Sequence, residues 1–302
     1  MKNSLSFLLL SLVSLAVHAG DIHVIPYPVK VEMQRGTVRL PLSAPESVRI
    51  DAGMAHADEY RLTLSRKGVD IVAQSTAGLQ YARETLAQLR AQYGEELPAL
   101  TVTDYPRYEW RGLMLDCSRH FYSLEYLKKQ VDMLAHYKMN RLHLHLTDDQ
   151  GWRIEIKRYP ELTQRGAWRT FNQQDSICID TYKDQPEFEL DPRFIVRNGD
   201  RTLYGGYYTQ EELRSLVAYA RERHVEIIPE IDMPGHTQAI SAIYPQFTAT
   251  GEASWGTIFS VPLSPAKEEV YTFLQHILDE VMDIFPSHYI HIGADEVEKN
   301  TW

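Results

Sequence analysis

The chain has 302 residues, of which 44% are hydrophobic and 11% aromatic. A chain of this composition buries a sizeable core, which argues against intrinsic disorder. The formal net charge is −10 with no block of like charges, so nucleic acid and anionic membranes are poor partners, because both select a basic surface. A neutral substrate fits this charge better.

Residues 1–19 have the pattern of a cleavable secretory signal. Lys2 precedes an apolar stretch over residues 5–17, and the small residues Val17 and Ala19 occupy the third-last and last positions. The apolar run is short for a bilayer, and no later segment approaches the ~20 residues needed to span one. We therefore expect a protein exported to the periplasm or the extracellular space, with no membrane span after cleavage.

Residues 21–105 predict a small α+β domain. Short β-like runs occur at residues 37–40, 47–50, 60–64 and 69–73. They are followed over residues 77–89 by Leu79, Ala82, Leu86 and Leu89 at helical spacing.

From residue 106 to residue 302 the pattern changes to apolar strands alternating with amphipathic helices. This alternation is typical of βα units around a parallel sheet. The strands are expected at 112–115, 141–146, 226–231 and 289–292, and the helices at 124–136, 210–223 and 265–285. Thr209 and Ser264 are the expected N-caps, and Glu212 completes a capping box with Thr209.

The predicted fold class is therefore α/β, a partial (β/α)8-type barrel of about four βα units after a small α+β domain. Residues 169–208 show little periodicity and are expected to be a loop insertion over the active face. The chain has two cysteines, Cys117 and Cys178, which could form one disulfide bridge or remain free thiols, and free thiols are favoured.

In a βα barrel the reactive groups lie at the carboxyl ends of the strands. A single charge there is commonly a solvated loop residue or a helix cap, but here all four strands are followed by polar or ionisable groups. Convergence of four sets favours an active site. The residues are Asp116, Ser118, Arg119 and His120; Thr147, Asp148 and Asp149; Asp232, Gly235 and His236; and Ala294, Asp295 and Glu296.

His143 and His145 alternate with leucines, so both imidazoles are predicted to face the barrel interior. A His-x-His strand also occurs in zinc-dependent hydrolases, which leaves a metal hydrolase as an alternative. No further His stands at ligand spacing beside the neighbouring carboxylates, and both His residues precede the strand end. Hydrogen-bonded interior histidines, with no metal, are the favoured interpretation.

The adjacent pair Asp295 and Glu296 indicates a division of labour, because neighbouring side chains diverge. Ordinary retaining glycosidases need two carboxyl groups ~5–5.5 Å apart across the scissile bond. In the substrate-assisted variant, the 2-acetamido oxygen of the sugar attacks the anomeric carbon instead. Asp295 would then orient the amide, and Glu296 would be the general acid and base.

Four ordered motifs resemble family 20 glycoside hydrolases, the β-N-acetylhexosaminidases. The motifs are residues 110–112 with 115–120, residues 143–153, residues 229–236 and residues 291–297. The resemblance implies that Arg119 and Asp148 belong to the substrate-binding set, with Arg119 on the hydroxyls at the far end of the terminal sugar. It also implies that Asp148, Asp232 and His236 form a hydrogen-bonded shell around the acid.

The implied function is hydrolysis of terminal non-reducing N-acetylglucosamine or N-acetylgalactosamine from glycans, with retention and no cofactor. The family barrel has eight βα units, so the resemblance also implies that the tryptophans walling the sugar pocket and a tyrosine on the acetamido oxygen are missing here. An inactive fragment that at most binds sugar is thus a second hypothesis. Unpaired edge strands would then favour self-association.

Overall fold

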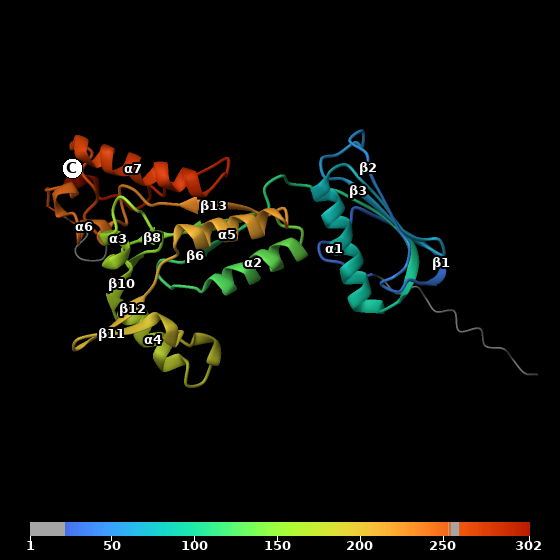
Figure 1. Cartoon of the computed structure of the whole chain (residues 1–302), viewed down its shortest axis with the longest axis horizontal. Helices are drawn as coiled ribbons and strands as arrows, with labels where there is room; N and C mark the ends of the chain where they lie inside the picture. Colours follow the sequence, from blue (N-terminus) through green and yellow to red (C-terminus); the bar gives the residue numbers. More distant parts are fainter. Residues whose placement is uncertain (1–21, 253, 255–259) are drawn as a thin grey trace, which may run out of the picture. The chain divides into compact units, whose positions relative to one another are not determined.

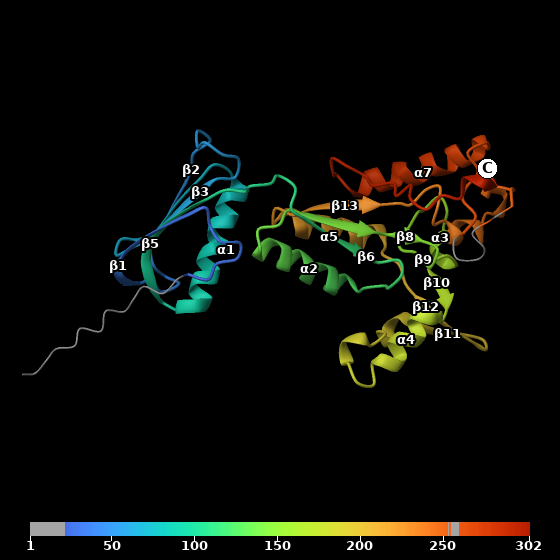
Figure 2. The same ribbon diagram turned by 180° about the vertical axis from the view of Figure 1, so that it is seen from behind.

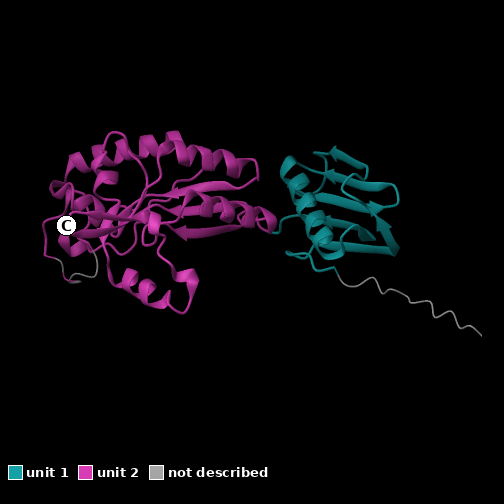
Figure 3. Ribbon diagram, turned by 60° about the horizontal axis from the view of Figure 1, so that its bottom comes forward, with its two compact units in different colours: residues 1–107 teal, residues 108–302 magenta. Residues whose placement is uncertain are grey.

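The computed structural model describes residues 22–252, 254 and 260–302, and the predicted signal at 1–19 lies outside them. The chain divides into two compact units, residues 1–107 and 108–302 (Figure 3). No helix in the described part of the chain is long and apolar enough to cross a membrane.

Unit 1 is a five-stranded sheet with one helix, in the strand order β1-β5-β3-β4-β2. Its elements are β1 Lys30–Arg39, β2 Glu46–Ile50, β3 Tyr60–Ser65, β4 Gly68–Ala73, α1 Thr76–Tyr93 and β5 Glu96–Asp104. Helix α1 begins at the Ser75 cap, whose side chain accepts a hydrogen bond from the Gly78 amide. Its apolar stripe, including Leu86 and Leu89, packs against the sheet, as the sequence predicts.

Unit 2 is built on three parallel strands in the order β13-β7-β6, covered by helices (Figures 1 and 2). The main elements are β6 Gly112–Asp116, α2 Leu124–His136, β7 Arg141–His145, α5 Gln210–Arg221, β13 Glu226–Glu230 and α7 Glu268–Ile284. Helix α2 has the predicted bounds. The capping box of Thr209 and Glu212 opens α5 as expected, whereas α7 begins three residues late with no side-chain cap. Ser264 is not that cap, because Lys267 occupies the N-cap position of α7.

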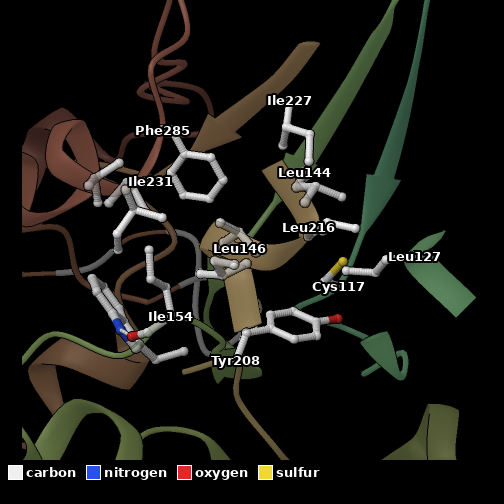
Figure 4. Close-up of a cluster of buried hydrophobic side chains, with 14 of the residues drawn as sticks. Cys117, Leu127, Leu144, Leu146, Ile154, Tyr208, Leu216, Ile227, Ile231 and Phe285 are labelled. Atoms are coloured by element: carbon white, nitrogen blue, oxygen red, sulfur yellow. Dashed lines mark hydrogen bonds between the residues drawn. The ribbon is translucent and has the colours of Figure 1, made fainter. Parts of the chain in front are cut away.

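The core of unit 2 lies between the sheet and its helices. Outward-facing Leu142 and Leu144 of β7 and Ile227 of β13 are buried with Leu127 of α2 and Leu216 of α5 (Figure 4). The opposite strand face carries Met114, His143 and Ile228 in one register row and Asp116, His145 and Glu230 in the next. The alternation of side chains therefore separates an apolar helix-covered face from a polar inner face.

The fourth predicted strand, residues 289–292, is not a strand in this structure. It makes a single parallel bridge between His291 and Glu230. The His291 amide donates to the Pro229 carbonyl, and the His291 carbonyl accepts from Ile231. The segment runs in the place expected for a fourth strand, but on its other side no further strand pairs with it among the described residues. The barrel is not closed.

Residues 169–208 hold more structure than the sequence predicts. Strands β10 Trp168–Thr170, β11 Ile195–Asn198 and β12 Arg201–Gly205 form a sheet in the order β10-β12-β11. Helix α4 Gln173–Thr181 follows β10, and its Asp175 bonds to Arg169 of that strand. We call residues 168–205 the insertion. The remaining short elements of unit 2 are β8 Thr147–Asp148, β9 Gly151–Trp152, α3 Glu161–Gln164, α6 Gln238–Ser241, and the 3₁₀ helices η1 Pro186–Phe188, η2 Pro192–Phe194, η3 Pro245–Phe247 and η4 Lys299–Thr301.

Candidate active site

Polar groups gather where the three strands end. Asp116, His145 and Glu230 are register partners at the last positions of β6, β7 and β13. The loops that follow these positions carry Arg119, Asp148, Asp232 and His236. Parallel strands thus bring together residues more than a hundred positions apart in the sequence.

Asp148 is the centre of this cluster, and its side chain has no exposed surface. Its Oδ2 lies 2.6 Å from Arg119 Nη2 and 2.8 Å from His145 Nε2, and its Oδ1 lies 3.3 Å from His236 Nδ1. Burial raises the pKa of Asp148, but these cationic partners outweigh it and lower the pKa to about 2. The carboxylate is therefore held ionised beneath three donors.

Arg119 is fixed by a neutral and two acidic partners. Beyond Asp148, its Nη1 donates to Asp116 Oδ2 at 2.9 Å, and its Nε donates to Gln150 Oε1 at 3.0 Å. One third of its side chain remains exposed. The guanidinium is held in one orientation while part of its fork stays open to a ligand.

His236 connects the buried cluster to the acidic pair. Its Nε2 lies 3.1 Å from Glu296 Oε2, while its Nδ1 faces Asp148 and lies 3.6 Å from Asp149 Oδ2. The carboxylates of Asp148 and Asp149 raise the pKa of His236 to about 11 against the opposing effect of burial. A protonated imidazole therefore stands between Asp148 and Glu296.

Asp295 and Glu296 are the exposed part of the site. Their side chains are 68% and 50% exposed, and Asp295 Oδ2 lies 3.9 Å from His236 Nε2. Ala294 and Glu296 have left-handed φ angles of 73° and 47°, and His236 one of 52°. Such backbone strain in non-glycine residues is concentrated at functional sites. Gly293 is also left-handed, and a Cβ there would collide with Asp232 Oδ1.

Asp232 is buried in the loop that follows β13, and its amide donates to Thr147 Oγ1 at 2.9 Å. Its Oδ2 lies 3.9 Å from His145 Nε2. Burial raises the pKa of Asp232 to about 7, with Glu230 and Asp148 adding to the rise and the charge of His145 opposing it. Asp232 therefore lies beside His145, and the structure brings all six candidate residues into one region: Arg119, Asp148, Asp232, His236, Asp295 and Glu296.

Two residues of this region were missed by sequence reasoning, Glu230 and His291. Glu230 Oε2 lies 2.7 Å from His143 Nε2 and 2.9 Å from His145 Nδ1, and Glu230 Oε1 lies 2.7 Å from His291 Nδ1. Burial opposes ionisation, but the imidazoles hold the pKa of Glu230 far below its usual range. The sequence could have pointed to Glu230, because pairing the predicted strands 141–146 and 226–231 from their first residues places Glu230 beside His145.

This histidine cluster bears on the metal alternative. Ligand atoms of His143, Glu230 and His291 lie within 4.8 Å of one another, a spacing that a cation could bridge. His143 and His145, the pair that suggested zinc, nevertheless contact the same carboxylate oxygen. Burial lowers the pKa of His145, but Asp148 and Glu230 raise it to about 10 overall, and a protonated imidazole is a poor ligand.

The chain combines parallel strands, helical crossovers and carboxylates at the strand ends, the arrangement of βα-barrel enzymes. Residues 108–302 match the catalytic domain of glycosyl hydrolase family 20, and residues 41–105 match domain 2 of that family. The chain belongs to glycosyl hydrolase family 20.

Among its relatives, a β-hexosaminidase of Vibrio furnissii is 42% identical over 80% of this chain and 38% of its own length. One of Akkermansia muciniphila is 37% identical over 98% of this chain and 56% of its own. The crystal structure of a Vibrio harveyi exo-β-N-acetylglucosaminidase in complex with N-acetylglucosamine is 32% identical, with a TM-score of 0.75 over 92% of this chain and 47% of that one. The chain spans about half the length, or less, of these relatives.

Proposed function

We propose that this chain carries the catalytic acid and its orienting partner of a β-N-acetylhexosaminidase that removes terminal non-reducing N-acetylhexosamine from glycans. The observation that supports this most strongly is the line Asp148–His236–Glu296, with Asp295 adjacent to its exposed end. The buried carboxylate of Asp148 holds the His236 cation, and that cation holds the exposed carboxyl of Glu296 in place, as a residue that transfers protons to and from the substrate requires.

The proposed reaction has two displacements at the anomeric carbon. The 2-acetamido oxygen attacks that carbon, the bond to the leaving oxygen breaks, and Glu296 gives that oxygen its proton. Asp295 accepts the amide N–H and stabilises the positive charge of the resulting oxazolinium ion. Water then attacks the same carbon, Glu296 takes the proton, and the acetamido group reforms, so the configuration is retained.

Arg119 is proposed to donate to the hydroxyls at the far end of the terminal sugar. Its forked donors are partly exposed and already oriented by Asp116 and Gln150. Asp148, with a fully buried side chain, would act on the sugar through Arg119 and His236. The relative crystallised with N-acetylglucosamine supports an N-acetylhexosamine as the ligand class.

The test is release of the chromophore from an aryl N-acetyl-β-glucosaminide by the purified chain and by Glu296→Gln. We expect the substitution to lower kcat by ~10²–10⁴-fold, because it removes the transferable proton and leaves the shape. Glu269→Gln, at an exposed position in the first turn of α7, is the matched control and should retain the wild-type rate. Equal rates for wild type and Glu296→Gln would contradict the assignment.

A second candidate is a chain that binds the sugar without hydrolysing it and that associates with itself. It is favoured by the pairing of residues 289–292 with β13 alone among the described strands, and by exposed Trp110, Met114 and Ile292. Calorimetric binding of N-acetylglucosamine with no chromophore release would support it. Light scattering would detect the association.

We also propose export to the periplasm or the extracellular space, on the sequence pattern of residues 1–19. N-terminal sequencing of the protein recovered from the outer compartment tests this. A mature chain that begins at residue 20 is expected, and a retained leader would contradict it.

A further inference from the structure

The loop after β6 is held by arginine side chains at three successive carbonyls. Arg153 Nε donates to the Cys117 carbonyl at 3.0 Å, and its Nη2 donates to the Ser118 carbonyl at 2.6 Å. Arg169 Nη2 donates to the Arg119 carbonyl at 2.9 Å. On the other side, Asp116 Oδ1 accepts from the amides of Ser118 and Arg119, each at 2.9 Å. Little freedom is left to the backbone that carries Arg119.

Arg169, from β10 of the insertion, also reaches the residue that orients the Arg119 side chain. Its Nη1 donates to the Gln150 carbonyl at 3.2 Å. The side chain of the same Gln150 accepts from Arg119 Nε at 3.0 Å. The guanidinium of Arg169 therefore fixes two backbone positions, that of Arg119 and that of Gln150, whose side chain orients Arg119.

A buried carboxylate fixes Arg169 in turn. Asp175 Oδ1 lies 2.8 Å from Arg169 Nη2 and Oδ2 lies 3.2 Å from Nε, and the two side chains are 3% and 13% exposed. The Arg169 guanidinium also lies 4.9 Å from the centre of the buried Tyr204 ring, whose hydroxyl accepts from the Phe121 amide. Asp175 Oδ2 accepts from the Asn172 amide in the capping box of α4. The start of α4 is thus joined to the loop that carries Arg119.

We propose that Arg169, held by Asp175, is a positioning residue for Arg119, through which the insertion sets recognition of the terminal sugar. The sugar part of this inference rests on the proposed function; the positioning part does not. Arginine is required because one planar fork must reach a carboxylate and two carbonyls together, which a lysine ammonium cannot do over the same span.

The first test uses NMR and is independent of activity. The Nε–Hε signal of Arg119, assigned with Arg119→Lys, reports its hydrogen bond to Gln150. We expect this signal to shift in Arg169→Lys and in Asp175→Asn. Arg193→Lys, which changes an exposed ion pair with Asp191 in the same insertion, is the control and should leave the signal in place. An unmoved Arg119 signal in folded Arg169→Lys and folded Asp175→Asn would overturn the proposal, whatever the chain hydrolyses.

The second test separates KM from kcat on the aryl substrate. Arg169→Lys should raise KM on the order of 10-fold with little change in kcat, because misplacing Arg119 weakens binding without touching Glu296. On the 4-deoxy analogue, which lacks a hydroxyl for Arg119, the same substitution should cost much less. An equal penalty on both substrates, or a loss confined to kcat, would overturn the proposal. A wild-type chain that hydrolyses neither substrate refutes the proposed function alone, and the NMR result then decides the positioning of Arg119.

Discussion

The loop after β6 and the segment at residues 289–298 carry the two halves of the proposed site, and they are held in different ways. Arg119 lies on a backbone fixed by Arg153, Arg169 and Asp116. Asp295 and Glu296 are exposed, they follow a single β-bridge, and among the described residues their charge partner is His236. In the half proposed to bind the sugar, charged side chains fix the backbone that carries Arg119. In the half proposed to be catalytic, the backbone bonds to β13 lie before the acidic pair, and the side chains of Asp295 and Glu296 face one imidazole, that of His236.

The same contrast separates stability from activity. The charges of Asp148, His145 and Glu230 are buried at the polar ends of the strands, so removing one of them leaves its partners uncompensated. The exposed carboxylates of Asp295 and Glu296 make few contacts, so their removal leaves the fold intact. Substitutions of the buried charges should therefore lower the free energy of unfolding. Substitutions of Asp295 or Glu296 should lower the rate and leave the free energy of unfolding unchanged.

Asp148→Asn should have the largest effect on stability. It removes a buried charge that faces Arg119, His145 and His236, and we expect the free energy of unfolding of unit 2 to fall by about 3–5 kcal/mol. Urea unfolding followed by fluorescence measures this. The control is Asp132→Asn, which breaks a half-exposed pair with Arg223 and should cost no more than about 1 kcal/mol. Equal losses would contradict a central role for Asp148.

Asp295→Asn should reverse this profile. The substitution keeps the shape but loses the charge proposed to stabilise the oxazolinium ion, so kcat should fall by ~10²–10³-fold. The unfolding transition should not move, because the side chain is 68% exposed. Asp180→Asn, at an equally open position in α4, is the control and should change neither quantity. A destabilised Asp295→Asn with unchanged kcat would reverse our comparison.

The pH dependence of stability is expected to follow the two buried imidazoles. The pKa of His145 is raised from 6.5 to about 10 and that of His236 to about 11, so their stabilisation is complete below pH 6.5 and is lost as the pH rises toward these values. Asp148 acts in the opposite window, because its pKa is lowered from 3.8 to about 2 and its contribution is lost as the pH falls below 3.8.

Urea unfolding at about pH 6 and about pH 9 measures the alkaline limb. The free energy of unfolding should be lower at the higher pH, and His236→Gln should reduce the difference. A free energy that stays constant between these pH values in wild type would show that the imidazoles are neutral in the folded protein.

The smallest effect is expected from chelation. His143 and His145 already contact Glu230, so removal of divalent cations should leave the rate on the aryl substrate unchanged. Assay after dialysis against a chelator, beside elemental analysis of the protein, measures this. Stoichiometric zinc together with loss of rate on dialysis would restore the metal hydrolase hypothesis.

Local signals predicted the fold where they were strong. The Thr209 and Glu212 capping box and the apolar stripe of α2 are specified by neighbouring residues alone. Strand β5 was not among the predicted runs, and Pro98 lies where its register with β1 shifts, between Met33 and Thr37. A proline inside a strand weakens the sequence pattern, and tertiary pairing restores the strand.

The candidate site was predictable as a set of strand ends but not as a network. Chain order placed Asp148, His236 and Glu296 after successive strands, yet it carried no information on which of them touch. Glu230 looked like one more residue of an apolar strand until its register with His145 was known. The ion pair of Arg169 and Asp175 lies in a stretch without hydrophobic periodicity, where local patterns predict neither strands nor ion pairs.

The central claim is that the acetamido oxygen of the substrate is the nucleophile, supported by Asp295 and followed by proton transfer from Glu296. It is tested most directly by the rates on aryl glycosides whose N-acetyl group carries increasing numbers of fluorine atoms, at a constant leaving group. Fluorine withdraws electrons from the carbonyl oxygen, so we predict that kcat/KM falls steadily with each substitution. Rates independent of fluorine content would contradict the account, because the nucleophile would then have to come from the protein or from water.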